Sequence, residues 1–584
     1  MPASTSSLPR PSSASRVLAL LLALRIVNAL SLTTFFQPDE FFQSLEPAWQ
    51  LAFGRASNAW ITWEWAAQLR SSLHPHLFAG VYLVAAKIAA LCTLSPSAHA
   101  ELLIAAPKVA QAVAAALQDW YTWKLAETVF GPHSRTAFTT LALSVCSPWQ
   151  WFCSTRTLSN CLETTISIAA VYYWPWHLTP AARDGVHRNH VANHIAARNI
   201  PGRVQLRVSL LLAASACILR PTNVLIWLVI ALPTLWQASA RARYIVIRET
   251  LFCGSGVLAC SVLSDRLYYR VWTLPPLRFL YFNIAQSLAV FYGRNRTDYY
   301  LTEGLPLLLT TALPFALGGT WLAIRGKAPT EEHVARTILQ RLAWTVLIVT
   351  LSLSAIAHKE VRFLYPVLPF LHVLSAGPLS SFLSPRSASR KAILTLALFV
   401  NLLIAGYASQ VHQRGVIDVL TYLRHKHEAR VITHGGKTTT TVGFLMPCHS
   451  TPWRSHLVHA GIDAWALTCE PPLHVPLAER HAYMDEADQF YIDLGPATWL
   501  KSNMENLQTV SGSRTQRHWA QQDATLKAAD RRSWPDHLVF FEQLEPTLRK
   551  LLKDTAYSEC WRGFNTHFHD DWRRKGDVVV WCLD

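Results

Sequence analysis

Residues 17–36 read VLALLLALRIVNALSLTTFF, an apolar run as long as a helix that crosses a lipid bilayer. The stretch before it is rich in Ser and Pro and carries Arg10 and Arg16. The run is long for the hydrophobic part of a secretory signal peptide, and no clear small-residue cleavage site follows it. We therefore interpret it as a retained signal anchor, with residues 1–16 as a cytosolic tail.

Similar apolar segments recur along the chain as far as residue 409. After 17–36 the candidates are 77–94, 102–118, 137–153, 158–176, 208–220, 224–238, 249–263, 305–324, 342–357, 363–383 and 392–409. Several are shorter than the roughly 20 residues of a simple crossing, which suits broken or paired helices around a cavity. The sequence thus predicts a polytopic α-helical membrane protein with about 11–12 membrane segments.

The composition supports a membrane protein and excludes a nucleic-acid-binding one. Hydrophobic residues make up 51% of the chain and charged residues 15%, against about 25% charged residues in soluble domains. Residues 1–409 hold 33 basic and 16 acidic residues, and residues 410–584 hold 20 and 21. The net charge of +16 therefore comes from the membrane half, where basic loops mark the cytosolic side.

The basic loops orient the predicted helices. Arginine and lysine gather in the cytosolic candidates 181–207, 239–248, 325–341 and 384–391. Alternation then places in the lumen the segments 37–76, 219–223, 264–304, 358–362 and everything after 409. One segment between 77 and 176 must then lie within or along the membrane without crossing it, most simply 77–94 or 102–118. A glycosylation sequon, Asn295-Arg296-Thr297, falls in a predicted lumenal loop.

Residues 410–584 form a separate soluble domain of the α/β class in this interpretation. Strand-like pieces at 429–433, 538–542 and 577–582 alternate with helical ones. The domain carries four cysteines, Cys448, Cys469, Cys560 and Cys582. An oxidising compartment could pair them, although four free thiols fit the sequence equally well.

The first predicted lumenal loop carries two adjacent carboxylates just beyond a membrane helix. Residues 37–44 read QPDEFFQS, with Asp39 and Glu40 between a proline and aromatic residues. A sugar hydroxyl that attacks a phosphate-activated sugar needs a carboxylate base within hydrogen-bond reach. If this segment is extended, neighbouring side chains point to opposite sides, and only one of the two can serve. The alternative interpretation is that Asp39 and Glu40 only form a solvated helix end and take no part in catalysis.

The same loop continues with residues suited to carbohydrate. Trp63, Glu64, Trp65 and Arg70 offer rings for stacking and polar groups for hydroxyls, although an aromatic belt at the membrane interface gives the same pattern. A second charged loop, 358–362, reads HKEVR between two apolar segments. Its cations His358, Lys359 and Arg362 could hold a departing lipid phosphate, or could snorkel to the interface.

These strings, in this order, resemble the dolichyl-phosphate-mannose-dependent mannosyltransferases of glycosyltransferase family 22, polytopic enzymes of the GT-C class. Residues 37–40 read QPDE where the family usually has HPDE, residues 155–160 read TRTLSN, and residues 358–360 read HKE before Arg362 and Phe363. The likeness spans most of residues 30–410, so the predicted catalytic membrane domain is 17–409. Gln37 is a departure, but it leaves the two carboxylates intact.

Within the family, the chain is most similar to the members that act on the GPI-anchor precursor. The strings ITWEW (61–65), FYG (291–293), YLTEGLP (300–306), GFLMPCHSTPW (443–453) and LTCEPP (467–472) carry this resemblance. Residues 294–298 depart from it, because a His-Pro-Trp stretch is usual there. Cys448 and Cys469 lie in two of these strings and are the expected disulfide pair.

The resemblance implies a reaction. The third mannose, α1,2-linked, would pass from dolichyl-phosphate mannose to a GPI precursor in the endoplasmic reticulum with inversion, because the donor is β-linked. Asp39 would be the base, with Glu40 as the alternative, and Arg156 and Tyr292 would join the first loop in holding the acceptor. No metal, other cofactor or obligate protein partner is implied.

Three other functions compete with this one. An enzyme of the same family could add mannose to the lipid-linked oligosaccharide of N-glycosylation, but the C-terminal domain argues against it. A lipid-linked-sugar transporter would place ionisable residues near the middle of the membrane and often shows internal repeats. A catalytically inactive assembly subunit would not need the intact Asp39-Glu40 pair.

Overall fold

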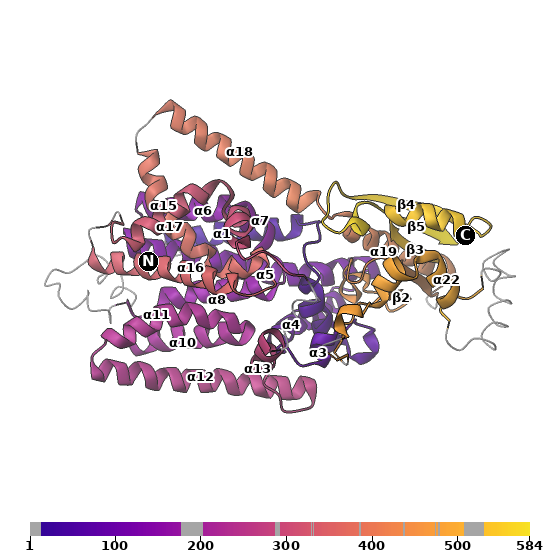
Figure 1. Ribbon diagram of the computed structural model, residues 1–584, viewed down its shortest axis with the longest axis horizontal. Coiled ribbons are helices and arrows are strands. Elements are labelled where there is room, and N and C mark those ends of the chain that lie inside the picture. Colours follow the sequence, from indigo (N-terminus) through magenta and orange to yellow (C-terminus); the bar gives the residue numbers. More distant parts are fainter. Residues whose placement is uncertain are drawn as a thin grey trace, which may run out of the picture. The chain divides into compact units, whose positions relative to one another are not determined.

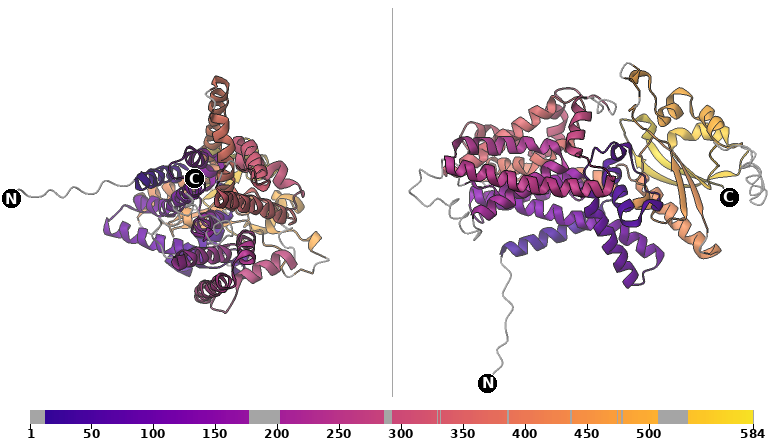
Figure 2. Two further views of the ribbon diagram at one scale, coloured as in Figure 1. Left: turned by 90° about the vertical axis from the view of Figure 1, so that its left-hand side faces the viewer. Right: turned by 90° about the horizontal axis from the view of Figure 1, so that it is seen from below.

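The structure is a computed structural model, and it describes residues 13–583 except 177–201, 286–292, 329, 331, 385–386, 436–437, 474, 477–478 and 507–530. The chain divides into two compact units (Figures 1 and 2). The helical unit comprises residues up to Ser31, Gln68–His74 and Pro107–Gly406. The sheet unit comprises Leu32–Ala67, Pro75–Ala106 and Tyr407–Asp584.

The helical unit contains no β-strand among its described residues. Its helices are α1 (Ser13–Ser31), most of α5 (Pro96–Phe130), α6 (Arg135–Cys146), α7 (Pro148–Cys153), α8 (Ser159–Tyr173), α10 (Gly202–Leu219), α11 (Val224–Gln237), α12 (Ala240–Tyr269), α13 (Pro275–Leu280), α14 (Leu305–Leu309), α15 (Leu313–Ile324), α16 (His333–Ser354), α17 (Leu368–Leu383) and most of α18 (Ala388–Gln410). Short 3₁₀ or π segments are η5 (Pro221–Asn223), η6 (Tyr281–Ala285), η8 (Tyr300–Gly304), η9 (Thr310–Ala312) and η10 (Val361–Val367).

Within the described residues, nine helical stretches are long and apolar enough to cross a membrane. They are Ala14–Ser31, Leu73–Leu91, Pro96–Phe130, Gly202–Leu219, Ala240–Tyr269, Tyr300–Ile324, His333–Ser354, Val361–Leu383 and Ala388–His434. The predicted segments 137–153, 158–176 and 224–238 correspond to α6, α8 and α11, which are shorter than a simple crossing. The class predicted from the sequence, a polytopic helical membrane protein, is confirmed.

A buried polar network joins the helices of the helical unit. Arg25 on α1 and Asp119 on α5 are fully buried, with Nε and Oδ2 2.6 Å apart. Ser144 and Gln150 donate hydrogen bonds to Asp119, and the Tyr365 hydroxyl donates to Gln150 at 2.7 Å. Buried charges are stable only when paired and hydrogen-bonded in this way. Through Tyr365 the network anchors η10, the segment that begins within the charged loop 358–362.

The sheet unit combines the first loop with the C-terminal domain. Before the sheet it contains η1 (Phe41–Leu45), α2 (Glu46–Phe53), η2 (Arg55–Ser57), α3 (Trp63–Ala66), most of α4 (Leu73–Leu91) and α19 (Gly415–His434). The strands are β1 (Thr440–Leu445), β2 (Ile462–Ala466), β3 (His537–Phe541), β4 (Tyr557–Thr566) and β5 (Gly576–Leu583). Between them lie α20 (Arg454–Leu457), η11 (Arg480–Ala482), α21 (Glu486–Asp488), η12 (Gln489–Asp493), α22 (Pro496–Asn503), η14 (Glu542–Leu544), α24 (Glu545–Leu551) and η15 (Trp572–Arg574).

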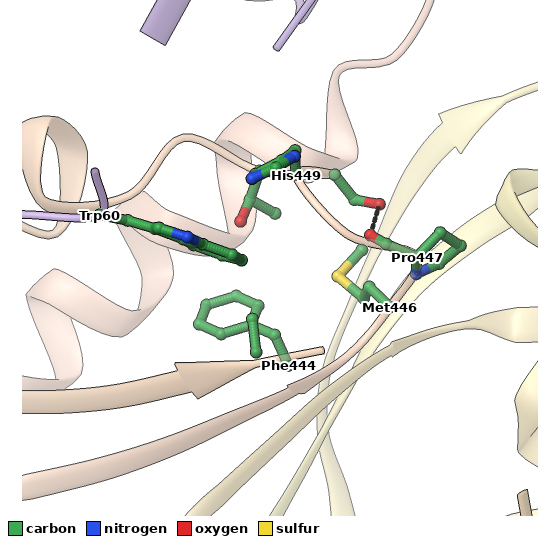
Figure 3. Close-up of a pocket in the computed structure, with 8 residues that line it drawn as sticks. Trp60, Phe444, Met446, Pro447 and His449 are labelled. Atoms are coloured by element: carbon green, nitrogen blue, oxygen red, sulfur yellow. Dashed lines mark hydrogen bonds between the residues drawn. The ribbon is translucent and has the colours of Figure 1, made fainter. Parts of the chain in front are cut away.

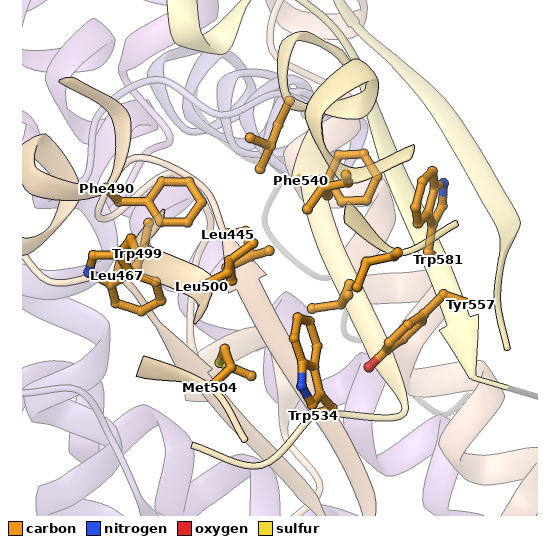
Figure 4. Packing of buried hydrophobic residues seen from close by; sticks show 14 of the residues in the cluster. Leu445, Leu467, Phe490, Trp499, Leu500, Met504, Trp534, Phe540, Tyr557 and Trp581 are labelled. Atoms are coloured by element: carbon orange, nitrogen blue, oxygen red, sulfur yellow. The ribbon is translucent and has the colours of Figure 1, made fainter. Parts of the chain in front are cut away.

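The five strands form one mixed sheet in the order β2-β1-β3-β5-β4. β1 runs parallel to β2 and β3, whereas β5 runs antiparallel to both β3 and β4. An apolar cluster of Leu445, Phe490, Trp499, Leu538, Phe540 and Trp581 packs on the sheet (Figure 4). The α/β class predicted for this region is thus confirmed.

The predicted strands 538–542 and 577–582 are confirmed as β3 and β5, but the strand predicted at 429–433 is wrong. Those residues end helix α19. Val416, Val419, Leu420 and Leu423 are buried at helical spacing, so burial of one helix face outweighs the local β-propensity of 429–433. The helix ends at Gly435, whose positive φ of 88° suits a glycine cap.

Prolines widen two helices into π turns. Pro47 follows η1, and Pro306 follows η8. A proline inside a helix lacks the N–H that would bond the carbonyl four residues earlier, and its ring crowds that carbonyl. The backbone instead closes bonds one residue wider, from Glu46 N–H to Phe41 O and from Leu305 N–H to Tyr300 O. Single π turns occur frequently at functional sites, and η1 directly follows Asp39 and Glu40.

Candidate active site

Asp39 and Glu40 lie at the start of a helix in the sheet unit. The Pro38 carbonyl accepts hydrogen bonds from the N–H groups of Phe41 and Phe42, both at 2.9 Å. The extended geometry considered from the sequence is therefore wrong. Consecutive side chains on a helix point about 100° apart, so the two carboxylates still face different directions. Asp39 is half-buried and Glu40 is buried.

Two residues of the predicted sugar-binding group brace this helix start. Glu64 accepts hydrogen bonds from Gln43 Nε2 at 2.9 Å and from the Thr62 hydroxyl at 3.2 Å. The Trp65 indole is buried and donates to the Phe42 carbonyl at 3.0 Å. These contacts fix the backbone just after Glu40. Trp63, on the same short helix, is half-buried.

The C-terminal domain also supports the first loop, through Glu46. This carboxylate is fully buried and accepts hydrogen bonds from the backbone N–H of Ser455 at 2.8 Å and of Trp60 at 3.2 Å. Burial raises the pKa of Glu46, although the two N–H groups oppose the shift. Residues 37–67 and the segment around Ser455 therefore belong to one folded structure. Sequence patterns alone do not indicate a role for Glu46, because a lone carboxylate on a short helix resembles a solvated one.

Aromatic contacts join the same two regions. The imidazole of His449 lies 4.4 Å from the ring of Phe42 and 4.7 Å from that of Trp60, measured between ring centroids. Trp60 also packs edge-on against Trp453 at 5.1 Å, and Phe41 against His456 at 5.2 Å. The string at 443–453, noted from the sequence only as a resemblance, thus forms part of the surroundings of the carboxylate pair.

Two disulfides hold the C-terminal domain. Cys448 pairs with Cys469, as expected, and Cys560 pairs with Cys582, which links β4 to β5. Cys448, Cys469 and His449 have potential metal-ligand atoms within 4.8 Å of one another. The two sulfurs, however, are joined in a disulfide and cannot act as the thiolates that a zinc site needs.

The charged loop 358–362 lies in the helical unit and is organised around Glu360. Arg362 holds this carboxylate through Nε at 2.6 Å and Nη2 at 2.8 Å, and His358 Nε2 lies 3.2 Å from it. Burial alone would raise the pKa of Glu360, but Arg362 and His358 outweigh burial and hold the pKa well below its usual range. The hydrogen bond to Glu360 raises the pKa of His358.

Lys359 differs from its neighbours in this loop. Its side chain is buried, and among the residues that the structure describes no carboxylate pairs with its ammonium. The Lys359 N–H donates to the Asn295 amide oxygen at 2.8 Å, and the Asn295 N–H donates to the Ala357 carbonyl. The candidate glycosylation residue Asn295 is therefore half-buried against this loop. A buried, carboxylate-free lysine is suited to an anionic ligand.

The other predicted site residues divide between the units. Arg70 belongs to the helical unit, where its guanidinium lies 5.5 Å from the ring of Phe279. Arg156, in the same unit, is buried and donates to the Phe152 carbonyl at 2.9 Å. Tyr292 lies outside the described residues. Arg70 is thus not part of the unit that holds Trp63, Glu64 and Trp65.

Arg220 is a further cation near the charged loop, and it lies outside the site predicted from the sequence. It is buried in the turn between α10 and α11, where Nε lies 3.9 Å from Glu163 and the guanidinium lies 5.2 Å from the ring of Phe363. Phe363 directly follows Arg362, so Arg220 adds positive charge beside the charged loop. The signal available in the sequence was its position in a short predicted lumenal turn.

Residues 16–458 match the Alg9-like mannosyltransferase family. GPI mannosyltransferase 3 of Aspergillus fumigatus is 50% identical over 98% of this chain and 78% of its own length. GPI mannosyltransferase 3 of Gibberella zeae is 43% identical over 96% and 94%. GPI alpha-1,2-mannosyltransferase 3 of Mus musculus is 32% identical over 96% and 87%.

The fold is similar to that of a solved membrane enzyme. ArnT from Cupriavidus metallidurans bound to undecaprenyl phosphate aligns with a TM-score of 0.53 over 98% of both chains, at 14% identity. At that identity the likeness concerns the fold alone. It covers the helical unit and the sheet unit together, so this combination of a helical membrane region with a small C-terminal sheet domain recurs in another protein.

Proposed function

Because the chain belongs to the Alg9-like mannosyltransferase family and is a multi-pass membrane glycosyltransferase, we propose that it adds the third, α1,2-linked mannose to the GPI-anchor precursor. One observation carries the proposal. The family match ends at residue 458, whereas the similarity to GPI mannosyltransferase 3 enzymes covers 98% of the chain. The similarity to GPI mannosyltransferase 3 enzymes therefore extends over the C-terminal domain. Most of that domain lies beyond the end of the family match.

In this proposal the charged loop binds the donor, dolichyl-phosphate mannose. The leaving group is a single lipid phosphate, and its negative charge grows as the glycosidic bond breaks. Lys359 is the best-placed cation in the loop, because Arg362 and His358 are already engaged with Glu360. Arg362 acts through Glu360 as a positioning residue, and Arg220 adds positive potential nearby. This arrangement neutralises a monophosphate without a metal ion, so we propose a metal-independent reaction.

Asp39 is the proposed base, with Glu40 as the alternative. The base removes a proton from the acceptor hydroxyl as this oxygen attacks the anomeric carbon of the donor mannose. Attack opposite a β-linked phosphate yields an α-linked product in one displacement. Asp39 is preferred because Glu40 is more deeply buried, while both start a helix that Trp65 and Glu64 brace.

We further propose that the enzyme resides in the endoplasmic reticulum with the sheet unit in the lumen. The basic loops favour this orientation, since basic residues concentrate on the cytosolic side. The two disulfides of the C-terminal domain favour an oxidising compartment. Protease added to intact microsomes should leave residues 410–584 undigested, and their digestion would contradict the orientation.

The acceptor assignment is tested by complementation. The chain is expressed in cells that lack the third GPI mannosyltransferase and, in parallel, in cells that lack each lumenal mannosyltransferase of the N-glycan pathway. The accumulated two-mannose GPI precursor should disappear only in the first cells. Correction of a truncated lipid-linked oligosaccharide instead would overturn the proposal.

A further inference from the structure

A small pocket opens in the sheet unit between the first loop and the C-terminal domain. Trp60, Phe444 and His449 are among its lining residues, and Figure 3 shows the three rings around one opening with Met446 beside them. The empty space is about 200 Å³, including the open mouth. Most of this space belongs to the open mouth, and the enclosed part has room for about one water-sized group. A hydroxyl can therefore enter the pocket while the rest of a sugar ring stays at the mouth.

The backbone of His449 is held in an unfavourable conformation. Its φ is 54°, in the left-handed region that residues other than glycine seldom adopt. The surrounding loop maintains this conformation through the Cys448–Cys469 disulfide and a hydrogen bond from Arg574 to the Cys448 carbonyl at 3.1 Å. Such strain persists only where the surroundings enforce it, and it concentrates at ligand sites.

The His449 imidazole is neutral and incompletely bonded. Nδ1 lies 3.6 Å from Cys469 Sγ, and Nε2 is buried without a hydrogen-bond partner among the described residues. Burial lowers the pKa of His449 to about 4, with Arg574 acting in the same direction and Asp39 opposing it. A neutral ring suits an uncharged hydroxyl rather than a phosphate, because phosphate sites use cationic donors.

The position of His449 connects the pocket to the carboxylate pair. Its ring packs on Phe42, three residues after Asp39, and its protonation responds to the charge of Asp39. The pocket therefore adjoins the folded first loop that carries the proposed base. The substrate that meets the base is the acceptor, whose sugar is neutral.

We propose that His449 binds a hydroxyl group of the acceptor's mannose, with Trp60 and Phe444 forming apolar walls for the sugar ring. The inference rests on the proposed function and adds the C-terminal domain to the acceptor site. It gives the strained loop at His449 a role in distinguishing acceptors, in addition to holding the fold.

Two substitutions separate hydrogen bonding from packing. His449→Phe keeps a ring against Phe42 and Trp60 but removes both nitrogens. His449→Asn removes the ring but keeps a polar group and tolerates a positive φ. With full-length protein in membranes, the Phe variant should raise the acceptor KM about five- to tenfold, the size of one hydrogen bond, and leave the donor KM unchanged. The Asn variant should raise the acceptor KM less. His459→Asn, at a residue paired with Glu428, is the control that should change neither constant.

Acceptors that each lack one hydroxyl of the terminal mannose, other than the 2-hydroxyl that attacks the donor, provide the second measurement. The wild-type enzyme should use one of these deoxy acceptors poorly, and His449→Phe should not distinguish it from the complete acceptor. The inference is overturned if the Phe variant keeps the wild-type acceptor KM, or if the Asn variant is the worse of the two and loses thermal stability, since packing would then be the role. Absence of transfer by the wild-type protein would instead count against the proposed function.

Discussion

The loop that carries Asp39 and Glu40 and the loop 358–362 are both short and charged, but they are held in opposite ways. The first is fixed by ring packing and by hydrogen bonds to backbone groups, such as that from Trp65 to Phe42. The second is fixed by ion pairs around Glu360. The first should therefore respond less to salt than the second, and the second should also respond to pH through His358. The proposed base and the proposed phosphate-binding cation thus have different supports.

The largest expected effect is on the carboxylate pair. Asp39→Asn keeps the size of the side chain but removes its charge, and a general base contributes about 10²–10⁴-fold, or roughly 3–5 kcal/mol of barrier. Transfer should nearly cease while the protein still accumulates in the membrane. Glu40→Gln should be the second most damaging change in the pair. Initial rates at matched protein levels decide this, and near-wild-type rates in both variants would refute the proposed mechanism.

Lys359→Met should act on the donor side instead. Loss of one charge-assisted hydrogen bond to phosphate costs about 1.5–3 kcal/mol, which corresponds to an increase of about 10- to 100-fold in donor KM. The acceptor KM should stay the same. Arg362→Lys should have a smaller effect, because Arg362 acts through Glu360. If Lys359→Met raised the acceptor KM instead, the assignment of roles to the two loops would be wrong.

Glu46 tests how the first loop is held. Glu46→Gln keeps the shape but replaces one of two accepting oxygens with an amino group, so it should lower the free energy of unfolding by about 1–2 kcal/mol. Glu46→Ala should lower it further, because both buried N–H groups lose their partner. Thermal unfolding of the purified wild-type protein, Glu46→Gln and Glu46→Ala measures their order of stability. Equal stability of all three would contradict the proposed support of the first loop by Glu46.

The smallest effect concerns pH. The pKa of His358 is raised above its usual value of 6.5, so the protonated ring fully stabilises the charged loop at a pH below 6.5. This contribution is lost as the pH rises through the raised pKa. The donor KM should therefore increase by at most about fivefold between pH 6.5 and 8. His358→Phe should remove this dependence. A steeper change in acceptor KM than in donor KM over the same range would contradict the comparison.

The sequence was sufficient for the fold class, for the order of the motifs and for the Cys448–Cys469 pair, because these follow from apolar length, from charge and from the family resemblance. It was not sufficient for the geometry of the site. The helical start at Asp39 is formed by hydrogen bonds from Phe41 and Phe42 to the Pro38 carbonyl, and the buried indole of Trp65 finds its acceptor in the Phe42 carbonyl. The backbone of His449 is held through the Cys448–Cys469 disulfide and Arg574, and its ring packs on Phe42 about 400 residues away in the chain; local sequence patterns contain none of these contacts.

One measurement tests the central claim most directly. Membranes containing the chain are supplied with radiolabelled dolichyl-phosphate mannose and the two-mannose GPI precursor, with chelator present, and the product is digested with an α1,2-specific mannosidase. We predict a three-mannose product that forms in the presence of chelator and loses all label on digestion. Label that resists digestion, or transfer that occurs from GDP-mannose but not from the lipid-linked donor, would contradict the account.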